Sequence, residues 1–176
     1  MIAVRFLAKV VGSFVVAAGL TLTVAPPPVA AVEFHAEDVV GGWVGELPCP
    51  FTSLTPGSGS TTTAAFECVS GTTWDGVWTG HTMYRVAGTL DVVSGDMHAT
   101  IDETLIGLVA ATQATGTLHL LGAVDVVGAT GAAVVRERIV GGTGAFLRSS
   151  GTVEFDGTQV ALAVGHGGYR GTWIHP

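Results

Sequence analysis

The chain has 176 residues, of which 48% are hydrophobic and 12% charged, and its formal net charge at pH 7 is −7. An acidic chain of this kind is repelled by nucleic acid and by anionic membranes, so we expect neither as a partner. The sequence contains no asparagine, which excludes N-glycosylation and any catalytic role for that residue type.

The first 31 residues predict a secretory signal peptide. Arg5 and Lys9 precede an apolar run over Val10–Val24, three prolines follow it, and small residues lead up to Ala31. The apolar run is shorter than the roughly 20 residues that a membrane-spanning helix needs. We therefore expect cleavage near Ala31 and a secreted protein with no stable membrane anchor; an uncleaved anchor is the alternative.

Cleavage at this point would leave residues 32–176, which number 176 − 31 = 145 and suit a single domain. Five arginines would then face 14 acidic residues, giving a net charge of 5 − 14 = −9. The single lysine, Lys9, would leave with the signal peptide, and this excludes Schiff-base chemistry on a lysine.

The two cysteines predict a disulfide in the N-terminal part of this domain, an N-terminal segment and loop over residues 32–72. Cys49 and Cys68 have 18 residues between them, and an isolated pair in an oxidising compartment most simply forms a disulfide. Loop closure of this length contributes about 3 kcal/mol. Residues 47–68 are rich in Pro, Gly, Ser and Thr and are interpreted as a surface loop pinned by that bond.

Residues 73–176 predict an all-β body. Short apolar runs alternate with polar residues, and turn-forming residues recur at intervals of about ten, which is typical of an antiparallel barrel or sandwich. The run LIGLVAATQ is interpreted as a strand followed by a loop. Gly95-Asp96 and Asp156-Gly157 predict two tight hairpins, of which the first places Gly88 opposite Glu103.

Side-chain alternation predicts which residues face the interior. Val135, Glu137 and Ile139 are expected to point inward, as are Glu103 and the residues that share its face. The arginines are expected to point outward, as is His119.

The glycine-rich stretch IVGGTGAFLRSSGTVEF, residues 139–155, is interpreted as a corner between two strands. A phosphate-binding loop needs a helix after its glycines, and here a second strand follows. No histidine spacing suggests zinc, and no G-x-S-x-G motif suggests a serine hydrolase. We expect neither a metal nor another cofactor.

Val140-Gly141-Gly142-Thr143-Gly144-Ala145-Phe146, followed by Ser150-Gly151, resembles the signature of dirigent proteins and allene oxide cyclases. More widely, residues 73–155 resemble small secreted bacterial proteins with an allene-oxide-cyclase-like barrel. The resemblance implies a calycin-like, antiparallel eight-stranded β-barrel, often a homo-trimer, with an apolar cavity. Gly41-Gly42-Trp43 also resembles the start of lipocalins. Because asparagine is absent, the resemblance does not bring cyclase activity with it.

Glu103 and Glu137 are the candidate catalytic residues. An inward carboxyl without a cationic partner has a raised pKa and suits a general acid or a hydrogen-bond donor. The alternative is that both glutamates lie at a barrel mouth, in contact with water or backbone. The candidate ligand-binding residues are Tyr84, Gly88, Trp74, Trp78, Tyr169 and Trp173, although aromatic residues at this spacing also suit a plain core.

These features predict a secreted barrel that binds a small apolar molecule in its interior. A cyclase or isomerase acting on a reactive small molecule is the alternative, because such chemistry depends mainly on the shape of the site. A third, structural role would require a barrel filled by its own side chains.

Overall fold

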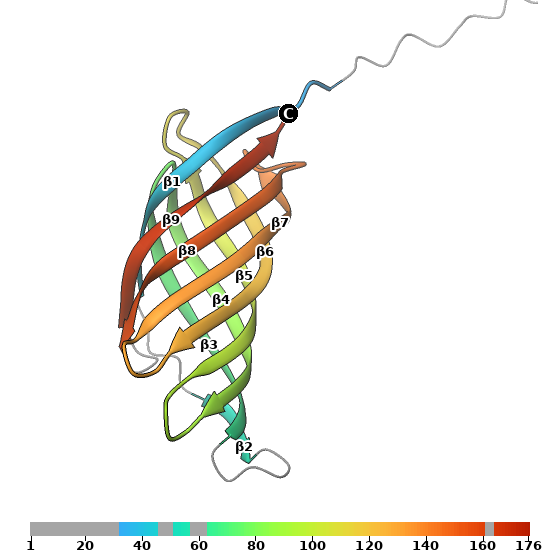
Figure 1. The fold of residues 1–176 in the computed structure, drawn as a ribbon. Helices are drawn as coiled ribbons and strands as arrows, with labels where there is room; N and C mark the ends of the chain where they lie inside the picture. The colour runs from blue at the N-terminus through green and yellow to red at the C-terminus, as the bar shows by residue number, and fades with distance from the viewer. Residues whose placement is uncertain (1–31, 46–50, 57–62, 161–163) are drawn as a thin grey trace, which may run out of the picture. The chain divides into compact units, whose positions relative to one another are not determined.

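The described residues from Val32 onward form a closed antiparallel β-barrel of eight strands with one extra strand (Figure 1). The computed structural model describes residues 32–45, 51–56, 63–160 and 164–176. It confirms the predicted all-β class and the eight-stranded antiparallel barrel. The predicted signal peptide lies outside the described residues, and among those described no helix is long and apolar enough to cross a membrane.

The strands follow the chain in simple order, each paired antiparallel with the next from β2 to β9. They are β1 (His35–Gly45), β2 (Phe51–Pro56), β3 (Thr63–Gly76), β4 (Trp78–Asp91), β5 (Met97–Val109), β6 (Ala114–Val127), β7 (Ala132–Gly144), β8 (Ser150–Val160) and β9 (Val164–His175).

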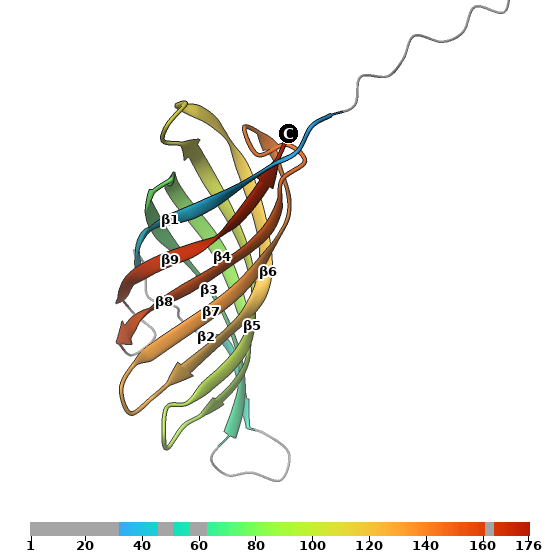
Figure 2. The same ribbon diagram turned by 45° about the horizontal axis from the view of Figure 1, so that its top comes forward.

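The barrel is closed by β1, which pairs with β9 on one side and with β3 on the other (Figures 1 and 2). The contact with β3 covers Gly41–Gly45 against Thr72–Gly76. The extra strand β2 pairs with the remainder of β3, over Ala64–Cys68. Strands β1 and β2 therefore divide β3 between them.

This closure corrects two predictions about the N-terminal part. The barrel does not begin at residue 73, because β1 and β3 both belong to it. Residues 47–68 are not one long loop, because β2 and the start of β3 lie within them. Cys68 is fully buried on β3, whereas Cys49 lies outside the described residues, so their pairing stays a prediction.

The first predicted hairpin exists, but the register predicted for it is wrong. Val86 lies opposite Ile101 and not Leu105, a shift of 105 − 101 = 4 residues. The cause is Asp91, whose carboxylate accepts hydrogen bonds from the backbone N–H groups of Val93 and Ser94 at 2.8 and 3.1 Å and so starts a wider turn. A shift of four preserves the inward face, but Gly88 now lies opposite Ala99.

The second predicted hairpin is wrong. β8 continues through Asp156-Gly157, pairing these residues with Gly168 and Gly167 of β9. The ring of Trp43 explains why a glycine stands here, since a Cβ on Gly157 would lie 2.8 Å from Trp43 Cζ2. The indole N–H of Trp43 also donates to the carbonyl of Asp156 at 3.2 Å. A strong local turn signal is thus overridden by packing.

The glycine-rich stretch is a strand corner, as predicted. β7 ends at Gly144, whose φ of +58° is one that glycine adopts readily, and β8 begins at Ser150. The β6–β7 register shifts between His119 and Leu120, which is a β-bulge. The turn folds Phe146 into the core, where it is fully buried.

The buried apolar residues form two clusters. One is aromatic and includes Trp74, Trp78, Phe146, Phe155, Tyr169 and Trp173. The other includes Phe66, Cys68, Val86, Met97, Ile101, Val124, Val126 and Ala133. The buried polar residues Ser70, Thr72, Thr82, Glu103 and Glu137 belong to neither cluster. They include both candidate glutamates.

Candidate functional site

Glu103 and Glu137 both lie inside the barrel, as side-chain alternation predicts. Glu103 is on β5, where its neighbours are Tyr84 of β4 and Leu120 of β6. Glu137 is on β7, where it lies opposite Gly122 of β6. Only 4% of Glu103 and 3% of Glu137 is exposed, which rules out the alternative of solvated glutamates at a barrel mouth.

Gly122 makes room for the Glu137 side chain. A Cβ on Gly122 would lie 2.7 Å from Glu137 Cγ, closer than two such carbon atoms can approach. Sequence reasoning did not single out Gly122. The signal was present, because the inward positions Leu118 and Leu120 put Gly122 on the same face two residues further along β6.

Hydroxyl groups connect Glu103 to the aromatic cluster. The indole N–H of Trp74 donates to Thr72 Oγ1 at 3.0 Å, and Thr72 Oγ1 lies 2.7 Å from Thr82 Oγ1. The hydroxyls of Thr82 and Thr72 both interact with the Glu103 carboxyl. The chain of hydrogen bonds therefore ends on a group that accepts them, and this favours an ionised Glu103 over an ionised Glu137.

Burial raises the pKa of both carboxyl groups. The pKa of Glu103 rises from 4.5 to about 7, because burial penalises the charge and the hydrogen bonds with Thr82, Glu137 and Thr72 offset that penalty only in part. The pKa of Glu137 rises well above 4.5 through burial first and the charge of Glu103 second. Two carboxyls that influence each other in this way titrate as a pair.

A hydrogen bond between the two carboxyl groups raises the pKa of Glu137 and lowers that of Glu103, but neither oxygen of Glu137 has a partner at ordinary hydrogen-bond geometry among the described residues. Both of its carboxyl oxygens are buried and unpaired. A buried polar atom without a partner costs about 1–3 kcal/mol, so each such atom in a folded protein calls for an explanation. A bound molecule that supplies the missing partner is one.

Tyr84 and Gly88, two predicted ligand-binding residues, lie apart. Tyr84 is the cross-strand neighbour of Glu103, and its phenol has a pKa raised by burial despite a hydrogen bond with Ser70. Gly88 pairs with Phe66 of β3 and Ala99 of β5, four residues along β4 from Tyr84. The structure therefore brings Tyr84 to the carboxyl pair and places Gly88 elsewhere.

The other four predicted ligand-binding residues pack against one another in the aromatic cluster. The ring centroids of Trp74 and Tyr169 are 5.3 Å apart, and those of Trp78 and Trp173 are 5.8 Å apart. The Tyr169 hydroxyl accepts from the Trp78 N–H and donates to the Trp78 carbonyl, both at 3.0 Å. These contacts suit a rigid core, although the indole nitrogen of Trp78 is buried without a partner.

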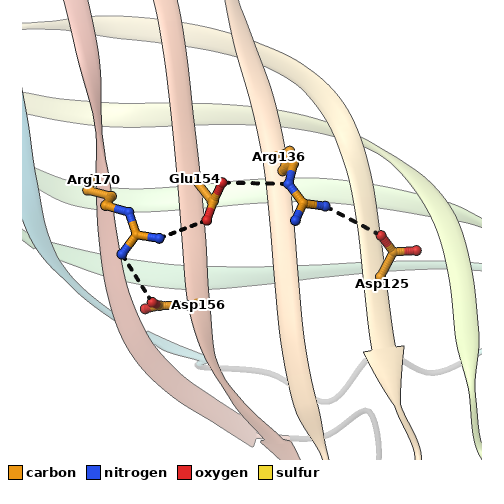
Figure 3. A network of polar contacts seen from close by, with 5 residues as sticks. All are labelled: Asp125, Arg136, Glu154, Asp156 and Arg170. Atoms are coloured by element: carbon orange, nitrogen blue, oxygen red, sulfur yellow. Dashed lines mark hydrogen bonds and ion pairs between the residues drawn. The ribbon is translucent and has the colours of Figure 1, made fainter.

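Arginine side chains are exposed on the outer face of the barrel (Figure 3). Arg170 contacts Glu154 at 2.9 Å and Asp156 at 3.5 Å, and Arg136 contacts Glu154 at 3.5 Å and Asp125 at 3.8 Å. A groove of about 890 Å³ runs over the same strands, and its lining includes Glu137 and Gly122 besides the exposed Arg136, Arg138 and Arg170. Because the ion pairs on its outer side are exposed and contribute little, the case for a ligand rests on the unpaired carboxyl of Glu137.

Within the described part of the chain, no group of three or more His, Cys, Asp or Glu side chains is placed to hold a metal ion.

No protein-family model and no curated protein matches this chain. Among solved structures, it is similar to that of the pterocarpan synthase dirigent protein GePTS1, at 16% sequence identity and a TM-score of 0.45. The match covers 88% of this chain and 98% of that chain. The barrel assignment itself rests on the strand pairing described above.

Proposed function

We propose that the barrel interior binds a small, mainly apolar molecule and that Glu103 and Glu137 hold its polar group. The unpaired, buried carboxyl of Glu137 is the observation that carries this proposal. Binding sites of this kind combine apolar walls with a few polar groups that orient the ligand. Here the two apolar clusters would supply the walls, and the unpaired indole N–H of Trp78 would offer a second polar contact.

Native mass spectrometry of the protein purified from its own host tests this proposal. We expect a noncovalent adduct on the wild-type protein that is lost or weakened in Glu137→Gln. Glu33→Gln is the matched control, because Glu33 is exposed near the N-terminal end of the described chain. A wild-type protein without any adduct, which also gains no stability from apolar compounds in a thermal-shift screen, would contradict the proposal.

A cyclase or isomerase of the dirigent or allene oxide cyclase type is the second candidate function. It is favoured by Glu103, whose pKa of about 7 allows the carboxyl to give and take a proton near neutral pH. The two candidates differ in the fate of the molecule. A carrier releases the adduct unchanged, whereas a cyclase or isomerase converts an added precursor into an isomer of equal mass and different retention time.

Secretion after cleavage near Ala31 and assembly into a homo-trimer also remain part of this proposal. The proposed disulfide between Cys49 and Cys68 is consistent with an oxidising compartment. Peptide mass mapping without a reducing agent tests the disulfide, and N-terminal sequencing of the exported protein tests the cleavage site. Light scattering of the purified protein tests the trimer.

A further inference from the structure

Among the described residues, the interior of the barrel contains an acidic pair and no arginine or lysine, and the mostly buried His175 contacts Trp173 and Glu37 instead of that pair. Glu103 and Glu137 are buried, while the five arginines of residues 32–176 are all exposed. The remaining titratable groups near the pair are Tyr84, which is neutral at pH 7, and Asp102, which neighbours Glu103 on β5 and points outward. The described residues thus give the pair no positive charge.

The pair carries a negative charge that depends on its protons. The hydroxyl groups that donate to Glu103 favour the state in which Glu103 is the ionised member and Glu137, whose pKa is raised by burial and by the charge of Glu103, keeps its proton. An ionised carboxylate enclosed without a counter-ion is unfavourable, and a cation within hydrogen-bond distance relieves this cost. One cation would balance the state in which Glu103 is ionised and Glu137 is protonated.

We propose that the molecule bound by Glu103 and Glu137 carries a cationic nitrogen, an ammonium group attached to an apolar body. This inference rests on the proposed function and specifies the class of its ligand. The ammonium N–H groups would donate to the carbonyl oxygen of the protonated Glu137 carboxyl and to the Glu103 carboxylate. The net charge of −9 on residues 32–176 would also attract a cation and repel an anion.

The competing ligands differ in their polar group. A neutral alcohol could donate one hydrogen bond to Glu137 but would leave the charge of Glu103 uncompensated. A carboxylate would add a third acidic group to the site and is disfavoured by repulsion. The ranking expected is therefore amine, then alcohol, then carboxylate, for the same apolar body.

Isothermal titration calorimetry with matched compounds tests the ranking. The probes are the primary amine, the alcohol and the carboxylate of three bodies of increasing size: cyclohexyl, adamantyl and decyl. We expect the amine of the best-fitting body to bind about 10- to 100-fold more tightly than its alcohol, the range for a hydrogen bond to a charged group. Glu103→Gln, which removes the charge that pairs with the ammonium group, should remove most of that difference, and Glu33→Gln should leave it unchanged.

Proton release supplies a readout that simple apolar binding does not change. An ammonium group fixes Glu103 in its ionised form, so amine binding should release protons, and the number released should be larger at pH 6 than at pH 8.5. Titrations in phosphate and in Tris, which have different ionisation enthalpies, measure this number. Glu103→Gln should abolish the release even if it still binds the amine.

The outcomes separate this inference from the proposed function. Equal binding of amine and alcohol, both weakened by Glu137→Gln, would overturn the cationic ligand and leave the interior binding site intact. If none of the nine compounds binds in the calorimetry, the cationic ligand is overturned. The interior binding site would still be upheld if native mass spectrometry shows an adduct on the wild type that is lost in Glu137→Gln. Tight amine binding that neither variant changes would place the amine away from the carboxyl pair and contradict both.

Discussion

The free energy of unfolding should fall as the pH rises from 4.5 to 8, because the carboxyl pair must ionise inside the barrel. The pKa of Glu103 is about 7 in the folded protein against an ordinary value of 4.5. The folded state thus binds this proton more tightly than the unfolded state, and the stabilisation is complete below pH 4.5 and is lost through pH 7. At about 1.4 kcal/mol for each tenfold change in affinity, the loss from Glu103 alone is about 3 kcal/mol.

Urea denaturation at pH 5, 6, 7 and 8, followed by tryptophan fluorescence, measures this dependence. Trp74 and Trp78 are suitable reporters because both are buried. Between pH 5 and pH 8, we expect the free energy of unfolding of the wild type to fall by about 3 kcal/mol or more relative to that of the double variant Glu103→Gln/Glu137→Gln, whose glutamines cannot ionise. Glu137, whose pKa is also raised by burial, should add to the fall.

The difference between the two proteins cancels the effects of the other acidic residues, and Glu33→Gln provides the exposed control. If the free energies of unfolding of the wild type and the double variant change in parallel from pH 5 to 8, the predicted cost of ionising the buried pair is refuted. That result would mean that the glutamates ionise in the folded protein without penalty, and hence that water or an unrecognised cation reaches them.

Three further predictions concern the scaffold. Tyr169→Phe should destabilise the fold by about 1–3 kcal/mol in thermal denaturation, because it leaves a buried N–H and a buried carbonyl unpaired. Gly142→Ala should cost about 1–3 kcal/mol, because its Cβ would lie 2.7 Å from Phe146 Cβ, whereas Gly42→Ala, whose Cβ would be 3.5 Å from the nearest atom, should have little effect. Glu154→Gln should change the urea midpoint by less than about 1 kcal/mol, since the ion pairs that it breaks are exposed.

The inward position of the glutamates could be predicted because alternation tolerates errors in register. The β4–β5 pairing was displaced by four residues, and an even displacement leaves every side chain on its own face. Glu103 therefore pointed inward in both the predicted and the observed register. Its neighbour did change, from Gly88 to Tyr84, so the immediate surroundings of the carboxyl could not be predicted.

Strand β3 was not recognised because the Pro, Gly, Ser and Thr residues of 47–68 indicated a loop. Its inward face begins with Ala64, Phe66 and Cys68 and continues through the buried polar residues Ser70 and Thr72. Because the strand was not recognised, the hydroxyl groups that this face presents to the barrel interior could not be predicted.

The prediction of a turn at Asp156-Gly157 was wrong for a different reason. This pair of residues is among the strongest local signals for a hairpin. The ring of Trp43, from a strand more than 110 residues earlier, contacts Gly157 and keeps β8 extended there. A contact over that sequence separation is invisible to any rule that examines a short window.

Glu103 and Glu137 form the buried pair that we propose a ligand completes. Carbon-13 NMR of the glutamate side-chain carboxyls, titrated with and without the best-binding amine, measures this directly. We expect the Glu103 resonance to titrate near pH 7 in the free protein and at lower pH with the amine bound. Ordinary titration of both glutamates between pH 4 and 5, unchanged by any of the nine compounds, would contradict the account.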